Sequence, residues 1–226
     1  MERKTDQVLE HYMQSCMADS AHDQEHIYRV LYHALAIAET ESNVDYDVLV
    51  AACLLHDIGR QEQFADPEVD HAERGAQKAY HFLRESSFSE EQTQHICDCI
   101  RTHRYRHDMP PTSIEAKILF DADKIDVSGA LGIARTLVYI GRISEPLYSI
   151  RSDGTVSDGT NDPSPSFFQE YKFKLEKLYQ QFYTEEGARI AGQRRQAAID
   201  FYHSMLQEVR TAYCDGKRRL DNWLKG

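Results

Sequence analysis

Apolar side chains recur every three or four positions along most of this chain, and no segment alternates convincingly at every second position. A repeat near 3.6 residues predicts amphipathic helices, whereas alternation would predict half-buried strands. We therefore expect an all-α protein with short loops. The segments with this repeat are 5–18, 24–41, 45–57, 71–83, 89–103, 112–125, 130–140, 167–182 and 184–213.

One of these segments is apolar on most sides, over residues 50–55, which predicts a central buried helix. Its C-terminal end carries His56 and Asp57, and Gly59 follows two residues later. Neither an imidazole nor a carboxylate is a natural end for a buried segment unless something binds it. We therefore predict that this adjacent pair turns toward one divalent cation where the helix gives way to a loop.

The helical pattern stops between residues 151 and 166, where the text SDGT occurs twice and is followed by Asn161-Asp162-Pro163-Ser164-Pro165. Glycine, proline and small polar residues predict an exposed loop there. The chain has 226 residues, which suits one domain over 1–226. We expect a core over about 20–140, the loop at about 151–166, and two additional C-terminal helices over about 167–213.

Charge and composition narrow the function. The net charge of -11 argues against a nucleic-acid polymer as the main partner, although local positive charge can still hold a small anion. Five scattered cysteines do not form a disulfide framework. No apolar run approaches the roughly 20 residues that span a membrane, and the start Met1-Glu2-Arg3-Lys4 is unlike a signal peptide. We expect a cytoplasmic protein without membrane contact; a homo-oligomer stays open.

Two imidazoles and two carboxylates are the candidate metal ligands: His26, His56, Asp57 and Asp123. A mixed set of nitrogen and oxygen ligands suits Mn²⁺, Fe²⁺, Co²⁺, Ni²⁺ or Zn²⁺, and with fewer nitrogens Mg²⁺. Four protein ligands leave one or two coordination positions open for water. Such a water would have a lowered pKa and could attack phosphorus, while the metal polarises a phosphoryl oxygen.

The order H…HD…D resembles the signature of the HD superfamily of metal-dependent phosphohydrolases. Similar segments occur in order over roughly 20–210, which is far more specific than an HD pair alone. The segment from Asp121 to Arg135 resembles the DADRLDALGAIGIAR of a subgroup of small, single-domain bacterial HD hydrolases. The other matching segments are HDQEHIYRV at 22–30, AACLLHDIG at 51–59, DHAERGA at 70–76, IRTH at 100–103, and the tail segments at 174–178 and 184–194.

This resemblance implies an HD-domain helical bundle, and it selects Asp123 over Asp121 and Asp126 as the last ligand. Extra histidines in this superfamily either bind a second metal or hydrogen-bond the phosphate. We expect one divalent metal ion, because His71 and His103 lack additional clustered ligands in the sequence. Their expected role is then contact with the substrate phosphate, or proton transfer to the leaving group.

The remaining candidates contact the substrate or assist the reaction. Asp57 can also orient the attacking water, and Glu73 can replace the histidines as acid or base or lie with the substrate-binding residues. His22 and Asp23 form a second His-Asp pair near the pocket. Four basic residues are candidate anion contacts, with solvated or structural salt bridges as the alternative: Arg29, Arg104, Lys124 and Arg135.

The resemblance thus implies a phosphohydrolase whose partner is a small phosphorylated substrate, first of all a nucleotide. Pyrophosphohydrolysis of nucleoside triphosphates is the leading reaction. A phosphodiesterase or 5′-nucleotidase of the same fold is the alternative among hydrolases. A di-iron oxygenase of HD type would need further ligands around His71 and His103. A binding protein with a vestigial metal site is a third class, and the complete ligand set argues against it.

Overall fold

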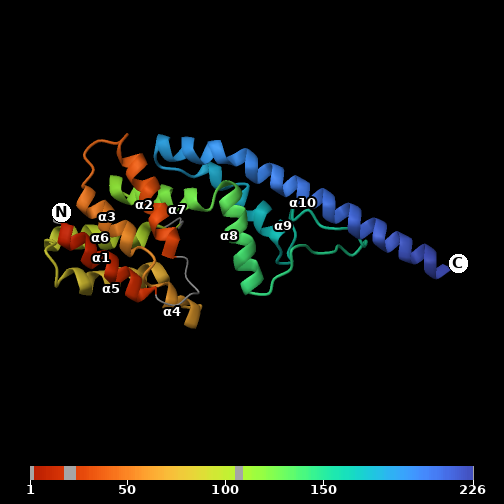
Figure 1. The fold of residues 1–226 in the computed structure, drawn as a ribbon, viewed down its shortest axis with the longest axis horizontal. Coiled ribbons are helices and arrows are strands. Elements are labelled where there is room, and N and C mark those ends of the chain that lie inside the picture. The colour runs from red at the N-terminus through yellow and green to blue at the C-terminus, as the bar shows by residue number, and fades with distance from the viewer. Residues whose placement is uncertain (1–2, 18–23, 105–108, 226) are drawn as a thin grey trace. The chain divides into compact units, whose positions relative to one another are not determined.

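The computed structural model describes residues 3–17, 24–104 and 109–225 (Figure 1). Within these residues every regular element is helical, and the only β contact is an isolated bridge between Ile150 and Val156. The prediction of an all-α fold is confirmed. The elements are α1 Arg3–Cys16, α2 Gln24–Ala38, α3 Tyr46–Leu55, α4 Arg60–Ala65, α5 His71–Leu83, α6 Glu90–Thr102, α7 Ile114–Asp126, α8 Gly129–Arg142, α9 Phe167–Glu170, η1 Tyr171–Leu175, η2 Leu178–Gln180 and α10 Glu185–Lys225.

The chain divides into two compact units. Unit 1 comprises Met1–Asp126 with Phe182–Gly187, and unit 2 comprises Val127–Gln181 with Ala188–Gly226. Among the candidate site residues only Arg135 belongs to unit 2. The expectation of a single domain over 1–226 stays a prediction.

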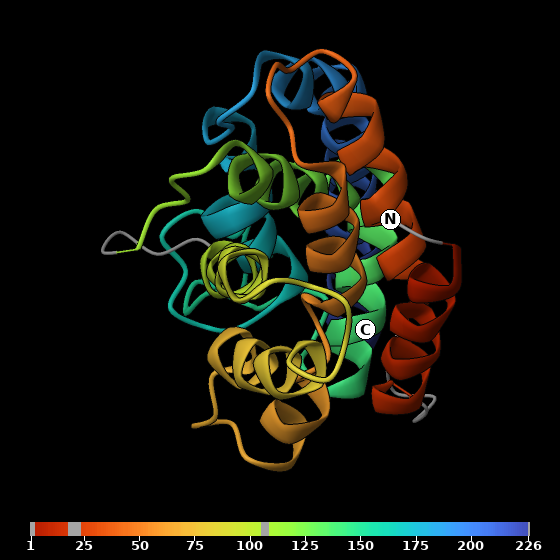
Figure 2. The ribbon, with the colours of Figure 1, turned by 90° about the vertical axis from the view of Figure 1, so that its left-hand side faces the viewer.

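Helix α3 forms the centre of unit 1, as its apolar sequence predicts. It packs against α1, α2, α5, α6 and α7, and its residues from Val48 to Leu55 are buried except for Val50 (Figure 2). Asp45 caps its N-terminus by accepting hydrogen bonds from the backbone N–H groups of Asp47 and Val48. The buried helix ends at Leu55, so His56 and Asp57 begin the next segment inside the core.

Side chains cap the starts of two further helices in unit 1. Ser89 and Gln92 form a capping box at the start of α6. The hydroxyl of Ser113 accepts a hydrogen bond from the N–H of Ala116 at the start of α7, so Ser113 serves as the cap there. Both caps fix the entry of helices that lead toward His103 and Asp123.

Helix α4 lies in a segment predicted to be loop. Its sequence RQEQFA has no apolar stripe, and none of its residues is buried. Packing at Gly59 explains its position, because a Cβ built on Gly59 would lie 2.3 Å from the backbone oxygen of His71 and 2.6 Å from the nitrogen of Gly75. Only glycine allows the start of α4 to approach α5 so closely.

The helices at the end of the chain also differ from the prediction. The expected helix over 167–182 is instead α9, the π-helical segment η1 and the 3₁₀ segment η2, with a non-helical stretch after Gln180. Apolar spacing alone does not distinguish hydrogen bonds to the third, fourth or fifth residue, so it could not predict this change of pitch. Helix α10 extends to Lys225, beyond the expected end at Tyr213. Its last residues are exposed, and their large apolar side chains, Leu220, Trp223 and Leu224, stand at helical spacing, which the prediction did not include.

The segment 151–166 contains no helix, as predicted, but it is not wholly exposed. Val156 and Ser157 are each 1 % exposed, and the N–H of Ser157 donates to the backbone oxygen of Ser149. Gly154 and Gly159 have φ angles of 82° and 86°, which favour glycine. The segment is thus a folded turn of unit 2.

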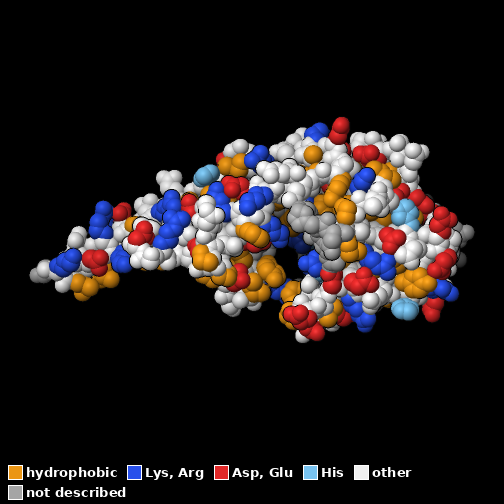
Figure 3. All heavy atoms as spheres, turned by 180° about the vertical axis from the view of Figure 1, so that it is seen from behind, with side chains coloured by type: hydrophobic (Ala, Val, Ile, Leu, Met, Phe, Trp, Pro, Cys, Tyr) orange, Lys and Arg blue, Asp and Glu red, His pale blue; other side chains and the backbone are white. Residues whose placement is uncertain are grey.

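The surface is that of a charged, helical protein. On the face shown in Figure 3, acidic and basic side chains lie among apolar ones. Among the described helices, none combines the length and the apolar character required to cross a bilayer. All five cysteines are free thiols, in agreement with their scattered positions.

Candidate metal centre

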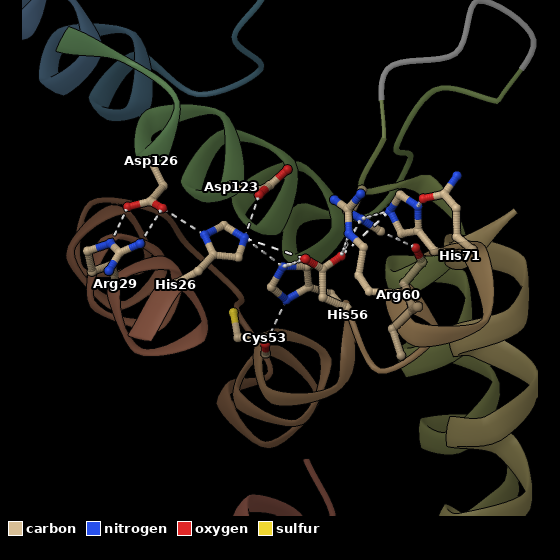
Figure 4. Close-up of polar contacts among 12 residues, drawn as sticks. His26, Arg29, Cys53, His56, Arg60, His71, Asp123 and Asp126 are labelled. Atoms are coloured by element: carbon tan, nitrogen blue, oxygen red, sulfur yellow. Dashed lines mark hydrogen bonds and ion pairs between the residues drawn. The ribbon is translucent and has the colours of Figure 1, made fainter. Parts of the chain in front are cut away.

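Three helices of unit 1 bring the four predicted ligands to one place (Figure 4). His26 comes from α2, His56 and Asp57 follow α3 directly, and Asp123 comes from α7. The Nε2 atom of His26 lies 3.4 Å from Nε2 of His56, 3.1 Å from Oδ1 of Asp123 and 3.7 Å from Oδ2 of Asp57. The two histidines and Asp57 are buried, whereas the Asp123 side chain is 25 % exposed. We call His26, His56 and Asp123 the first group.

His71 and His103 form a second group with the other oxygen of Asp57. The Nε2 atoms of both histidines lie 3.6 Å from Oδ1 of Asp57 and 3.3 Å from each other. All three side chains are buried. No further ligand is predicted near these histidines from the sequence, but Asp57 turns its second oxygen toward them. Only the fold shows this, because the two histidines stand at the start of α5 and directly after α6.

Each of the four histidines has its Nδ1 atom fixed by an oxygen acceptor. His56 and His103 donate from Nδ1 to the backbone oxygens of Cys53 and Ile100, at 2.8 and 2.6 Å. The Nδ1 atoms of His26 and His71 lie 2.7 Å from a carboxylate oxygen of Asp126 and from Oε1 of Gln63. An oxygen that only accepts fixes the proton on Nδ1. The Nε2 lone pairs therefore face the two groups.

This arrangement fits a cation. Two nitrogen lone pairs that face each other at 3.4 Å repel one another, and an ion bound by both removes the repulsion. Burial also lowers the pKa of His56 to about 4, so its imidazole is in the neutral form that metals require at neutral pH.

The carboxylates are held ionised. Burial alone would raise the pKa of Asp57, but Arg60 and the surrounding imidazoles lower it well below its ordinary value. Burial likewise raises the pKa of Asp123, but in the metal-free chain a protonated His26 outweighs it through its hydrogen bond and charge, so the net direction is downward; a bound cation would take the place of that proton. The centre therefore combines neutral nitrogen donors with charged oxygen donors, which suits a divalent transition metal.

Two residues that the sequence analysis did not assign to these roles complete the surroundings of the first group. Asp126, which is 0 % exposed, accepts from His26 and also from Arg29, whose Nε lies 2.7 Å from Oδ1. Asp126 lies one helical turn after Asp123, so the spacing alone indicates that both carboxylates are on the same face of α7. Arg29, expected as a substrate contact, directs its guanidinium to Asp126.

The second missed residue is Arg60. Its Nε donates to Oδ1 of Asp57 at 2.9 Å. It directly follows Ile58 and Gly59, and a basic residue three positions after a carboxylate can reach it on a helical turn. Arg104, an expected anion contact, has its Nη1 3.6 Å from Oδ2 of Asp70. Burial and the charge of Arg60 lower the pKa of Arg104.

The remaining predicted substrate contacts have other neighbours in the structure. Glu73 pairs with Arg101, with Oε2 and Nε 3.2 Å apart. The Nζ atom of Lys124 lies 4.0 Å from the centre of the Phe120 ring. Arg135 belongs to unit 2, so its role as a substrate contact stays a prediction. His22 and Asp23 lie outside the described residues.

Asp121, the rejected alternative ligand, supports the chain before α10. It is fully buried and accepts from the backbone N–H groups of Tyr183 and Thr184 and from the Thr184 hydroxyl. That hydroxyl in turn accepts from the N–H of Gly187. Asp121 thus serves as a buried anchor between α7 and the segment that leads into α10.

Known proteins share the arrangement of this chain. The family model described as HD domain matches residues 24–128. YpgQ of Bacillus subtilis (strain 168) is 25% identical over 215 residues, which are 92% of this chain and 95% of YpgQ. Its crystal structure superposes with a TM-score of 0.71 at 24% identity, covering 91% of this chain and 96% of that one.

Two further solved structures are similar. An HD-superfamily hydrolase from Bacillus thuringiensis has a TM-score of 0.69 at 26% identity, covering 92% of this chain and 98% of its own. A predicted HD superfamily hydrolase from an uncultured Thermotogales bacterium has a TM-score of 0.60 at 28% identity, covering 89% of this chain and 91% of its own. The matched residues 24–128 contain both groups of ligand-type side chains. Residues 24–128 therefore form an HD domain.

Proposed function

We propose that this chain, a metal-dependent hydrolase of the HD superfamily, cleaves phosphoanhydride or phosphate-ester bonds of nucleotides. Pyrophosphohydrolysis of nucleoside triphosphates is the leading reaction. The observation that carries the proposal is the buried first group with Asp57, in which neutral imidazoles and ionised carboxylates converge. The crystal structure of YpgQ in complex with ADP supports a nucleotide as the substrate class.

In this proposal His26, His56, Asp57 and Asp123 hold one divalent ion, which can be Mn²⁺, Fe²⁺, Co²⁺, Ni²⁺, Zn²⁺ or Mg²⁺. When bound, the ion activates a water molecule and polarises a phosphoryl oxygen. Asp57 can also orient the attacking water by accepting a hydrogen bond from it. Burial and the charge of Arg60 lower the pKa of His71 to about 2, so its imidazole is neutral near neutral pH and its Nε2 atom accepts a hydrogen bond rather than donating one.

The direct test is hydrolysis by protein from which metal has been removed with EDTA. We expect no product until Mn²⁺, Co²⁺ or Mg²⁺ is restored, and then pyrophosphate from nucleoside triphosphates. His56→Ala, purified in the same way, should stay inactive with added metal. Activity that survives both the chelator and this substitution would overturn the proposal.

The same assay distinguishes the hydrolase alternatives when orthophosphate and pyrophosphate are measured separately. Orthophosphate from nucleoside monophosphates would identify a 5′-nucleotidase. Cleavage of bis(p-nitrophenyl) phosphate, with no product from triphosphates, would identify a phosphodiesterase.

The second group favours one other candidate, a di-iron oxygenase, because His71 and His103 share Asp57 with the first group. Such an enzyme would hold two irons per chain and consume O₂ with an organic substrate. A metal count of one iron per chain after anaerobic loading would rule it out.

A further inference from the structure

Arg60 contacts the side of Asp57 that faces away from the first group. Its Nε donates to Oδ1 at 2.9 Å, while Oδ2 lies 3.7 Å from Nε2 of His26. Oδ1 is also the oxygen that lies 3.6 Å from both histidines of the second group. In Figure 4 the guanidinium of Arg60 and the ring of His71 lie beside each other. Arg60 therefore reaches the same carboxylate oxygen as the second group.

The second group needs positive charge nearby. The Nε2 atoms of His71 and His103 lie 3.3 Å apart with their lone pairs inward, because both Nδ1 protons are used elsewhere. The third member, Asp57, contributes its Oδ1 atom, 3.6 Å from both Nε2 atoms. Three electron-pair donors at this spacing bind a cation well, and both histidines are at most 2 % exposed, so bulk water does not screen them.

Arg60 supplies that positive charge permanently, since a guanidinium does not lose its proton in proteins. A divalent ion bound to Oδ1 would lie within a few ångströms of this guanidinium, and like charges at that distance repel strongly in a buried site. We infer that Arg60 takes the place of a second metal ion on Asp57, so that this chain holds one divalent ion where its ligand-type side chains could hold two.

The position of Arg60 also leaves it available to the substrate. About a third of its side chain, 34 %, is exposed. An exposed guanidinium beside a metal centre can also bind a phosphate anion. This part rests on the proposed function, whereas the number of bound ions does not require turnover.

The test counts metal ions. Metal-free wild type, Arg60→Gln and Arg60→Met are incubated with excess Mn²⁺, desalted, and analysed for manganese per chain and for coupled Mn–Mn pairs by electron paramagnetic resonance. Arg84→Gln is the matched control, because it removes one positive charge from an exposed pair with Glu90. Circular dichroism checks the fold, and Arg60→Met keeps the aliphatic stem if the glutamine variant does not fold.

We expect one ion in the wild type and in Arg84→Gln, and two coupled ions in both Arg60 variants. The second ion should bind more tightly to the variants than to the wild type, because the substitutions remove a positive charge beside Oδ1 of Asp57. Adding His103→Ala to Arg60→Gln should return the count to one, because it removes a ligand of the second group.

Two results would overturn the inference: two ions in the wild type, or one ion in both Arg60 variants. One ion without hydrolysis of any phosphate ester would overturn the proposed function alone. A wild type that binds no metal would overturn both.

Discussion

The orientation of His26 depends on a carboxylate that does not belong to the first group. Asp126 accepts from Nδ1 of His26 at 2.7 Å and is itself held by two guanidinium hydrogen bonds from Arg29. Such a carboxylate fixes the tautomer of a ligand histidine and increases its basicity. Arg29 and Asp126 are thus positioning residues that act on the metal through His26.

We therefore expect Asp126→Asn to weaken Mn²⁺ binding by roughly 10- to 100-fold. The asparagine amide is uncharged, so Nδ1 of His26 loses its charged hydrogen-bond acceptor. Isothermal titration of metal-free protein measures this change directly. Asp98→Asn is the control, since Asp98 pairs with Arg101 on α6. Equal affinities in wild type and Asp126→Asn would contradict a positioning role.

The burial of His56 predicts a pH dependence of the metal-free protein. Its pKa is lowered to about 4 in the folded chain, from 6.5, so the unfolded chain takes up this proton first as the pH falls. The stabilisation is thus present above pH 6.5 and is lost progressively down to about pH 4. On the order of 2–3 kcal/mol of unfolding free energy should disappear over this window.

Urea unfolding at pH 7.5 and pH 4.5 measures this loss, with His56→Gln as the comparison. The glutamine variant should lose less stability than the wild type over the same interval, because it lacks the titrating ring. If both proteins lose the same amount, His56 is not the group responsible.

At the scale of elements, the contact between α4 and α5 places His71. Gly59 stands where these helices meet, and a Cβ there would collide with the backbone of His71 and Gly75. Overpacking of this kind costs about 1–3 kcal/mol. Gly192 in α10 offers a matched position, since a Cβ there meets no atom within 4 Å.

Gly59→Ala should therefore lower the unfolding free energy by about 1–3 kcal/mol, because α5 must move away from α4. Gly192→Ala should raise it by about 0.5–1 kcal/mol, as alanine is favoured over glycine inside a helix. Chemical denaturation of both variants measures the two changes. The close approach would be in doubt if both substitutions had the same sign.

Most helices were predictable because their apolar stripes and caps agree. Asp45 and α3, or Ser89 and α6, combine both signals. Helix α4 has no stripe and depends on a tertiary contact at Gly59, so no local pattern could reveal it. The prediction of one helix over 167–182 fails for another reason. Apolar spacing does not determine helical pitch, so it could not show the change from α9 to η1 and η2.

The part of the candidate site that consists of motif residues was predictable from the sequence. Four ligand-type residues could be named because their order resembles a family signature. Gln63 could not be assigned, because its contact with His71 depends on where α4 packs, whereas the spacing of Arg60 from Asp57 was a signal that the motif did not include. The shared position of Asp57 between two groups likewise depends on the orientation of one carboxylate.

At the scale of the whole molecule, the metal centre and the fold of unit 1 depend on each other. His26 and Asp123 are nearly a hundred residues apart in sequence but lie 3.1 Å apart through Nε2 and Oδ1. An unfolded chain cannot present these ligands together. Metal binding should therefore stabilise the folded protein against unfolding.

Mn²⁺ at 100 times its dissociation constant should add about 2.7 kcal/mol to the unfolding free energy, because it binds only the folded chain. Denaturation with Mn²⁺ and with EDTA measures the difference. His56→Ala, which lacks a ligand, should show little of this gain. If Mn²⁺ stabilised the wild type and His56→Ala equally, the ion would bind at a site that does not include His56.

The most direct measurement of the central claim titrates metal-free protein with Mn²⁺ and records hydrolysis of a nucleoside triphosphate after each addition. The rate of pyrophosphate release should rise from zero in proportion to added metal and level off at one equivalent per chain. His56→Ala should remain inactive throughout. A rate that is already maximal before any metal is added, or that is equal in the variant, would contradict a metal-dependent hydrolase built on His26, His56, Asp57 and Asp123.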